Sequence, residues 1–538
     1  MKEYQHFGVM LDCSRNAVMN LPTLKRFIDC LEKMGYNTLE LYMEDVYDVK
    51  DEPYFGYLRG RYSQEELKEI GAYAAVHGIE LIPAIQTLAH YTNLAKLPHY
   101  AKERKLFDIL DILMAGDDGV YEFLDRLFAA LRKCFQTRHI NIGMDEAHFV
   151  GLGRYLDEHG FEDRFRILLK HLARVAEIAR KYGFEPHMWS DMFFRLGAKG
   201  EYEYTEGQLS EEVLNGVPEN VALCYWNYYD ERESHYDTMF SAHKLFGREI
   251  WFAGGAWSWN GFAPSPAVTY STMKPAFRSL LKTDIRNVII TMWGDNGSEC
   301  SRFSLLQTLY AIRRFGDGEF DEERIAAEFD KLFGVSFRDF ELLALPDAVP
   351  DHPVTTLSQL MNPSKVLLYS DPFLGKFDLA AQSLPQIPYG KYARKLCSVK
   401  RRAGDFAYLF ETMEKLCRVL EVKAYLGVQT RTAYRKNDRA LLQSLLKDYT
   451  RAISRLHTFY RAFRLLWFRE NKPFGFEIHD VRLGGLMQRL MHCRNRIEAY
   501  LSGKINRIEE LEEELLPYDN PNVLECNDYR KIISACEI

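Results

Sequence analysis

The chain of 538 residues lacks the features of a membrane or nucleic-acid-binding protein. It contains no run of about 18 apolar residues, so no membrane-spanning helix is expected. Its net charge is −7, and no basic excess is present that would contact phosphate groups. Residues 1–6 lack the basic and apolar segments of a secretory signal. We therefore expect a cytoplasmic protein with neither a nucleic-acid nor a membrane partner.

The sequence also lacks the common signatures of metal and cofactor sites. Its ten cysteines are scattered and no two have C-x-x-C spacing, which argues against a zinc site and a disulfide framework. Free thiols fit a reducing cytoplasm. His148 lies close to two acids, but no second histidine follows at ligand spacing, and Gly254-Gly255 is an isolated pair rather than a phosphate-binding loop. The sequence thus predicts no metal ion and no cofactor.

Short apolar segments alternate with helical patterns over about the first 310 residues. Helical spacing in 21–34 and 163–182 ends at glycines, as at Gly35 and Gly183. Polar and aromatic residues directly follow nearly every apolar segment. The segments predicted to be strands are 6–11, 37–43, 79–85, 138–142, 185–188, 221–225, 249–253 and 287–292.

Eight strands, each followed by a helix, predict a (β/α)₈ TIM barrel in the α/β class. A doubly wound open sheet is the rival fold. The polar strand ends favour the barrel, because all strand ends of a barrel face one mouth, whereas those of an open sheet converge only at its switch point.

The strand pattern disappears after about residue 320, and long helical patterns follow in 391–426, 431–471 and 476–501. We predict the barrel in residues 1–320 and a mostly α-helical C-terminal domain in residues 321–538. Two roles are open for these helices: they support the barrel, or they pair two subunits in a homodimer.

Two adjacent acids, Asp145 and Glu146, follow the predicted strand 138–142 and Gly143. Neighbouring side chains of a strand point to opposite faces, so both acids can serve one site only where the strand ends and turns. Paired carboxylates in different environments are suited to acid–base chemistry. The alternative is that both acids are merely solvated at the start of a loop. The residues around them must distinguish these two interpretations.

The other predicted strand ends carry residue types that bind sugars. Tryptophan rings stack on the apolar faces of pyranose rings, whereas carboxylates and arginine bind hydroxyl groups. Five of the seven tryptophans follow strand ends, which is more than core packing explains. The residues concerned are Arg15, His90, Trp189, Asp191, Trp226, Tyr228, Tyr229, Asp230, Trp257, Trp259, Trp293, Asp295 and Glu299.

The stretch Gly143-Met144-Asp145-Glu146 resembles the Gly-x-Asp-Glu motif of family 20 glycoside hydrolases, the β-N-acetylhexosaminidases. Trp189, Tyr228-x-Asp230 and Trp293-x-Asp295 make this resemblance specific, and it extends over roughly residues 5–320. The helical C-terminal domain resembles that of a compact bacterial branch of the family.

The resemblance implies retaining hydrolysis assisted by the substrate itself. Glu146 would protonate the leaving glycosidic oxygen and then act as base on the incoming water. Asp145 would hold the N–H of the 2-acetamido group, whose oxygen attacks C1 to form an oxazolinium intermediate. Tyr228 would donate a hydrogen bond to that oxygen.

The resemblance also implies which residues hold the sugar. Trp189, Trp293 and one of Trp257 or Trp259 would wall the sugar, with Trp226 nearby; Arg15 and Asp295 would bind outer hydroxyls, and His90 would lie near the acids. The family usually has Glu where this chain has Asp295, with Glu299 close behind. The preference between GlcNAc and GalNAc is therefore open.

We thus expect an exo-acting β-N-acetylhexosaminidase whose partners are β-linked N-acetylhexosaminide oligosaccharides. One alternative is a retaining glycosidase with a separate carboxylate nucleophile, such as Asp191 or Asp295. Another is a barrel that binds sugars without hydrolysing them.

Overall fold

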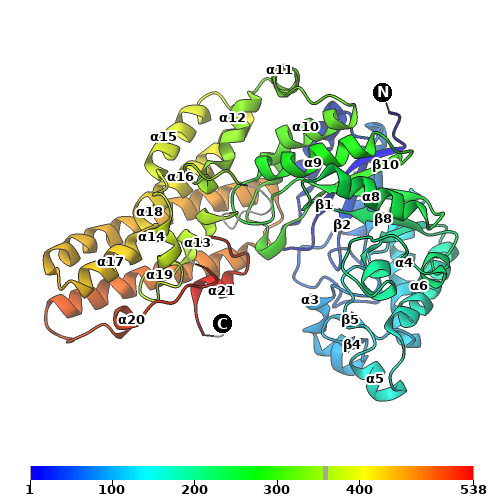
Figure 1. The fold of residues 1–538 in the computed structure, drawn as a ribbon, viewed down its shortest axis with the longest axis horizontal. Helices are drawn as coiled ribbons and strands as arrows, with labels where there is room; N and C mark the ends of the chain where they lie inside the picture. Colours follow the sequence, from blue (N-terminus) through cyan, green and yellow to red (C-terminus); the bar gives the residue numbers. More distant parts are fainter. Residues whose placement is uncertain (1, 355–360, 521, 537–538) are drawn as a thin grey trace. The chain divides into compact units, whose positions relative to one another are not determined.

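The computed structural model describes residues 2–354, 361–520 and 522–536, which divide into two compact units (Figure 1). The first unit contains the residues up to Gly255, Thr272–Met292 and Ile312–Phe320. The second contains Ala256–Ser271, Trp293–Ala311 and the residues from Asp321 onward. Within the described residues, no helix is long and apolar enough to cross a membrane. None of the ten cysteines, all of which are described, forms a disulfide.

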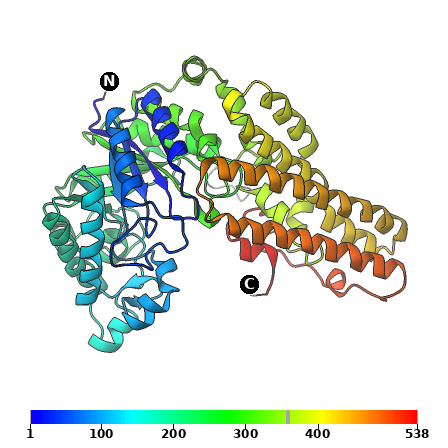
Figure 2. The ribbon, with the colours of Figure 1, turned by 180° about the vertical axis from the view of Figure 1, so that it is seen from behind.

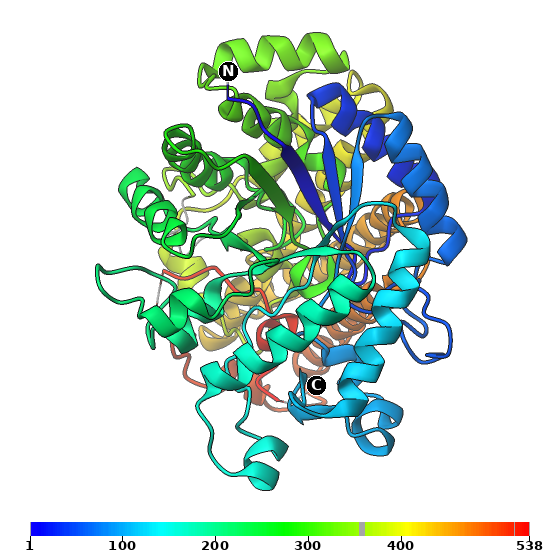
Figure 3. The same ribbon diagram turned by 90° about the vertical axis from the view of Figure 1, so that its right-hand side faces the viewer.

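The first unit is built around a closed barrel of eight parallel strands, in the order β1-β10-β9-β8-β7-β6-β3-β2 (Figure 3). Each predicted strand is present, so the barrel is confirmed and the open sheet was the wrong alternative. The strands are β1 (His6–Asp12), β2 (Thr38–Tyr42), β3 (Glu80–Ala84), β6 (His139–Asn141), β7 (Glu185–Trp189), β8 (Ala222–Trp226), β9 (Ile250–Gly255) and β10 (Asn287–Met292).

Closure of the barrel depends on a close approach at Gly8 of β1, which pairs with Thr38 of β2 and Ile289 of β10. A Cβ atom at Gly8 would lie 2.7 Å from Thr38 Cβ and 2.8 Å from Ile289 Cδ1. Real Cβ atoms do not approach other heavy atoms so closely, so glycine keeps the first and last strands in register here.

The helices predicted at 21–34 and 163–182 are confirmed to within one residue at each end. Asn20 caps the first helix by accepting a hydrogen bond from Thr23 N, and Gly35 ends it with a φ of 81°. Ser63 and Glu66 form a capping box at the second. The helices are α1 (Leu21–Met34), α2 (Gln64–Val76), α4 (Asp118–Cys134), α6 (Arg164–Lys181), α8 (Glu233–Lys244) and α9 (Pro266–Leu280).

A small antiparallel hairpin between β3 and α4 was not predicted. It consists of β4 (Phe107–Ile109) and β5 (Ile112–Leu113), which are too short to give a periodic signal. Its turn places Leu110 at a φ of 52° without the glycine or asparagine that usually marks such a turn. The hairpin therefore leaves little trace in the sequence.

The second unit is mostly helical, as predicted, but two predicted helices were too long. The pattern 391–426 is broken by a 3₁₀ turn at Gly404–Phe406, and the pattern 431–471 begins inside a separate helix. The helices are α15 (Tyr389–Lys400), α16 (Ala407–Lys423), α17 (Leu426–Arg435), α18 (Arg439–Glu470) and α19 (Phe476–Leu501).

The two longest helices, α18 and α19, lie side by side (Figure 2). Trp467 of α18 packs against Phe476 and His479 of α19, with ring centroids 5.8 and 5.1 Å away. The domain boundary between residues 320 and 321 remains a prediction, because the segments after β9 and β10 group with the second unit.

Candidate active site

The turn after β6 has an unusual backbone. Gly143, Met144 and Glu146 have φ values of 69°, 68° and 52°, in the left-handed region. A Cβ atom at Gly143 would lie 2.2 Å from Gln86 Oε1, so this position requires glycine. Left-handed conformations at non-glycine residues persist where the surrounding structure fixes them, often at functional sites. The strand therefore ends in a turn that lets consecutive side chains share one space.

Both acids of the turn meet at one imidazole. His90 Nε2 lies 3.2 Å from Asp145 Oδ2 and 3.7 Å from Glu146 Oε2. The Asp145 side chain is 13% exposed, whereas that of Glu146 is 49% exposed. The structure thus brings Asp145, Glu146 and His90 together and gives the two acids different environments.

The charges of Asp145 and His90 stabilise each other. Burial favours a raised pKa of Asp145, but the charge of His90 and hydrogen bonds from His90 and Gln86 outweigh it and lower this pKa. Burial likewise favours a lowered pKa of His90, but the carboxylates of Asp145 and Glu44 raise it to about 9. At neutral pH the pair is an imidazolium facing a carboxylate.

Gln86, which follows β3, holds Oδ1 of Asp145, the carboxylate oxygen that does not face His90. Its Nε2 donates to Asp145 Oδ1 at 2.7 Å and to Tyr42 Oη at 2.8 Å. Its Oε1 accepts from Met144 N at 3.2 Å. One amide therefore holds both the backbone of the turn and the carboxylate that the turn presents.

Arg15, predicted to bind sugar hydroxyls, forms an ion pair with Glu44 at the ends of β1 and β2. Its Nη1 lies 2.7 Å from Glu44 Oε1, which also accepts from Tyr42 Oη at 3.3 Å. The Arg15 side chain is 29% exposed, whereas Glu44 is buried. Through Tyr42 this pair joins the hydrogen-bond network that reaches Asp145.

The end of β7 supports the acid turn from the other side. Asp191 Oδ2 accepts a hydrogen bond from Glu146 N at 3.1 Å, and Trp189 N donates to Gly143 O at 3.2 Å. Burial, followed by the charge of Asp145, raises the pKa of Asp191 to about 7. Asp191 is fully buried, and its contact with the backbone of Glu146 makes it a support for the turn.

Aromatic rings gather at the end of β8. The ring of Trp226 stacks on Tyr228 at 5.6 Å between centroids, and Tyr202 lies 5.1 Å from Trp226. Tyr202 Oη is 2.6 Å from Ser190 Oγ, which links this group to the end of β7. Asp230 accepts hydrogen bonds from the backbone and side chain of Arg232 within its own loop.

Five predicted residues, Trp257, Trp259, Trp293, Asp295 and Glu299, belong to the second unit, and their place in the site stays a prediction. Trp257 and Trp259 are buried and stacked, with centroids 4.3 Å apart. Trp293 O accepts from Arg302 Nη1 at 2.8 Å, and Asp295 begins a 3₁₀ turn.

Glu299, which follows Asp295, is buried in the second unit with two cations. Its carboxylate lies 3.0 Å from Lys365 Nζ and 3.2 Å from Arg482 Nη1. This ion cluster occupies both of its oxygens.

The network around Asp145 was only partly anticipated. Gln86 is a polar residue after its strand with no motif to give it a role, and Tyr42 reads as the last apolar residue of β2. By their positions at strand ends, Glu44 and Asp191 are predicted to support the site rather than to contact substrate. The signal that could have found all four is their place at strand ends, beside the acid turn in the barrel order.

Enzymes built on a (β/α)₈ barrel carry their catalytic residues at the C-terminal ends of the strands. The paired acids of this chain lie at such an end, which places it in this class. Two family descriptions match the chain: "Glycosyl hydrolase family 20, catalytic domain" over residues 4–235, and "Glycoside Hydrolase 20C C-terminal domain" over residues 338–529. Together they cover most of the sequence. The chain belongs to glycoside hydrolase family 20.

Individual relatives are distant. "Beta-hexosaminidase" of Vibrio furnissii is 28% identical over 219 residues, covering 32% of this chain and 35% of that protein. Human "Hexosaminidase D" is 25% identical over 233 residues, covering 41% and 44%. The matches thus span less than half the length of these relatives. A solved β-N-acetylhexosaminidase of Bacteroides fragilis has a TM-score of 0.47 and 20% identity, covering 61% of this chain and 69% of that one.

Proposed function

We propose that the protein is an exo-acting, retaining β-N-acetylhexosaminidase that releases terminal GlcNAc, or GalNAc, by substrate-assisted catalysis. The observation that carries this proposal is the pairing of an ionised Asp145, only 13% exposed, with a half-exposed Glu146 at one imidazole. Family membership and the names of the relatives support the same activity. The substrates would be β-linked N-acetylhexosaminide oligosaccharides.

Asp145 is suited to act as a fixed anion rather than a nucleophile. Gln86 holds its Oδ1 and His90 faces its Oδ2, so the carboxylate is fixed before substrate binds. When the acetamido oxygen attacks C1, positive charge develops on the acetamido group. A preorganised carboxylate that accepts the N–H stabilises this charge without reorganising.

Glu146 is suited to transfer protons. Its side chain is half-exposed, so it can reach a glycosidic oxygen and exchange protons with water. It would protonate the leaving oxygen in the first step. In the second step it would take a proton from the water that opens the oxazolinium ion, so the β configuration at C1 is retained.

The remaining roles follow the residue types at the strand ends. Tyr228 would donate a hydrogen bond to the acetamido oxygen, and Trp189 and Trp226 would line the sugar. The roles of Trp293, of one of Trp257 or Trp259, and of Asp295 in binding the sugar are those that the family resemblance implies. Arg15 would use its remaining N–H groups on outer hydroxyls, while His90 keeps Asp145 ionised.

A panel of nitrophenyl β-glycosides of GlcNAc, GalNAc, glucose and galactose tests the proposal. We expect hydrolysis of the two N-acetylated substrates only, with inhibition by a GlcNAc thiazoline. Fast hydrolysis of the plain glucoside would instead support a carboxylate nucleophile, and binding without hydrolysis would support a sugar-binding barrel. The full burial of Asp191 argues against it as that nucleophile.

The stereochemical course provides a second test. Proton NMR during the first minutes of hydrolysis should show the β anomer of the released sugar before it equilibrates. An α anomer appearing first would mean direct attack of water on C1, and the substrate-assisted mechanism would be wrong.

A further inference from the structure

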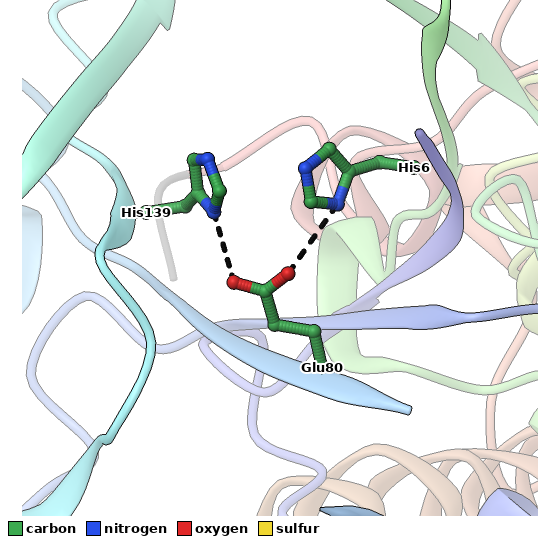
Figure 4. A group of neighbouring side chains, drawn as sticks. All are labelled: His6, Glu80 and His139. Atoms are coloured by element: carbon green, nitrogen blue, oxygen red, sulfur yellow. Dashed lines mark hydrogen bonds and ion pairs between the residues drawn. The ribbon is translucent and has the colours of Figure 1, made fainter. Parts of the chain in front are cut away.

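Two histidines and one glutamate meet at the N-terminal end of the barrel (Figure 4). His6 begins β1, Glu80 begins β3 and His139 begins β6. His139 Nδ1 lies 2.8 Å from Glu80 Oε1, and His6 Nδ1 lies 3.5 Å from Glu80 Oε2. One potential ligand atom from each residue lies within 4.8 Å of the other two. Figure 4 shows both imidazoles turned toward the same carboxylate.

This set of atoms matches the ligands of a divalent transition-metal ion. Two imidazole nitrogens and one carboxylate oxygen form a common three-residue site for Zn²⁺, with water in a fourth position. Ligand atoms about 2.0–2.2 Å from a tetrahedral ion lie about 3.4 Å from one another. The observed separations of 2.8 and 3.5 Å are close to this value, so small side-chain shifts would admit an ion.

The surroundings of the cluster leave polar atoms unsatisfied. His6 Nε2 and His187 Nδ1 are buried, and neither has a hydrogen-bond partner among the described residues. The ring of Trp251 lies between these two histidines, 4.7 Å from His6 and 4.3 Å from His187. Buried polar atoms without protein partners are commonly satisfied by ordered water, so the cluster lies in a polar environment.

An ion also has a route to the cluster. A cavity of about 240 Å³ borders His139, His187 and Trp251, and the carboxylates of Glu185 and Glu249 also line it. Acidic groups at such an opening attract cations. The side chains of His139 and Glu80 are 19% and 32% exposed, whereas that of His6 is 5% exposed. The buried His6 is thus held in place by the protein, whereas the more exposed side near Glu80 and His139 can admit a water ligand.

The alternative is a purely structural ion pair between Glu80 and His139. It explains the shorter contact, whereas His6 Nδ1 lies 3.5 Å from the second oxygen and 3.2 Å from Thr38 Oγ1, a hydrogen bond that a metal ion would replace. Binding of an ion would displace any proton from the coordinating nitrogens, so the affinity should rise with pH.

We propose that His6, Glu80 and His139 bind one Zn²⁺ or a similar first-row divalent ion. The strand β1 is not hydrogen-bonded to β3 or β6, so the ion would cross-link strands that the sheet itself does not join. The N-terminal end of such barrels serves stability, whereas catalysis occurs at the C-terminal end. An ion at this end would therefore stabilise the barrel and take no part in the hydrolysis, although its fourth position is open to water.

Metal titration of the untagged, chelator-treated full chain tests the proposal. Calorimetry with Zn²⁺ should show one saturable site per chain, and Co²⁺ should give the visible absorption of a tetrahedral nitrogen–oxygen site. Zn²⁺ should also raise the unfolding temperature. Absence of saturable binding in the wild-type protein would overturn the proposal without any variant.

Variants locate the ion. His139→Gln and Glu80→Gln should each weaken binding at least about 100-fold, because even loss of an outer partner of a ligand costs roughly 10–100-fold. His77→Gln is the matched control, since His77 pairs with Glu32 at 2.7 Å on the surface. Unchanged binding in the two ligand variants would place the ion elsewhere and overturn the proposal. Hydrolysis of a nitrophenyl GlcNAc substrate should survive chelation, so this test is independent of the proposed function.

Discussion

The two ends of the barrel use the same residue types in opposite proportions. At the C-terminal end one histidine, His90, faces two acids; at the N-terminal end His6 and His139 share one acid, Glu80. The excess of carboxylates keeps His90 charged, with a pKa of about 9, whereas burial and a neighbouring histidine keep His6 neutral, with a pKa of about 4. Neighbouring carboxylates thus keep one imidazole charged at the C-terminal end, whereas burial keeps one uncharged at the N-terminal end.

Backbone geometry separates the two ends as well. The C-terminal cluster lies on turns with left-handed residues at His90, Met144 and Glu146, whereas the N-terminal cluster uses the first residues of regular strands. Of the two clusters, only the one where we place the chemistry has left-handed residues, as expected if strain positions reacting groups.

The largest expected effect tests the role of Glu146. Glu146→Gln should lower turnover of an unactivated chitobioside by roughly 10²–10⁴-fold, the usual contribution of a positioned general acid. The loss should be smaller with a nitrophenyl leaving group, which needs little protonation. Steady-state kinetics on both substrates provide the measurement.

Glu122→Gln, at an exposed position on α4, is the control for this change. Equal losses of turnover on the two substrates would remove Glu146 from the role of proton donor.

The next effect tests how Asp145 is held. Gln86→Leu removes the donor to Asp145 Oδ1 and the acceptor of Met144 N. A hydrogen bond to a charged group contributes about 1.5–3 kcal/mol, so kcat should fall by about 10–100-fold while KM changes less. Gln136→Leu, at an exposed position, is the control. A change confined to KM would show that Gln86 acts on substrate binding rather than on the anion.

The charge on His90 predicts a pH dependence. Its pKa is raised from 6.5 to about 9, so the stabilisation from the Asp145–His90 pair is complete below pH 6.5 and disappears as pH rises through about 9. We expect kcat/KM to decline through this range. His90→Gln should have lower activity and lack this decline, and a wild-type profile that stays flat to pH 10 would contradict the ion pair.

The smallest expected effect on activity comes from the other end of the barrel. Glu80→Gln should leave kcat/KM within about twofold, because the N-terminal end of a barrel carries no catalytic groups. In metal-free protein, interactions with His139, Thr137 and His6 lower the pKa of Glu80 to about 2 despite its burial. The stability it adds is therefore present above pH 4.5 and is lost as pH falls toward 2.

Acid unfolding of the wild type and Glu80→Gln, followed by circular dichroism, measures this difference. The variant should be less stable at pH 7, and the difference should shrink below pH 4.5. A large loss of kcat/KM in a folded Glu80→Gln variant would contradict the assignment of catalysis to the C-terminal end of the barrel alone.

The sequence was informative where a local pattern determines the structure. Apolar segments located every strand of the barrel, and the rule that strand ends meet at one mouth placed Asp145, Glu146 and His90 together. The sequence did not predict contacts that long-range packing determines. Tyr42 reads as an apolar strand residue, yet its hydroxyl joins Gln86 to Glu44.

The N-terminal cluster could not be predicted for the same reason. His6, Glu80 and His139 are widely separated in sequence, and each lies at or next to the start of a different predicted strand. Barrel closure alone brings them together. The split between α15 and α16 was missed because Gly404 interrupts an otherwise continuous helical pattern by only a short 3₁₀ turn.

The left-handed turn at residues 143–146 has a practical consequence for engineering. Because the main chain aims the two acids, the tryptophans and tyrosines on other strands can be exchanged to admit a different sugar while the proton donor keeps its direction. An insertion or deletion of one residue within the turn would instead redirect both carboxylates at once. Libraries that seek new specificities should therefore vary the neighbouring loops and leave these four positions at their natural length.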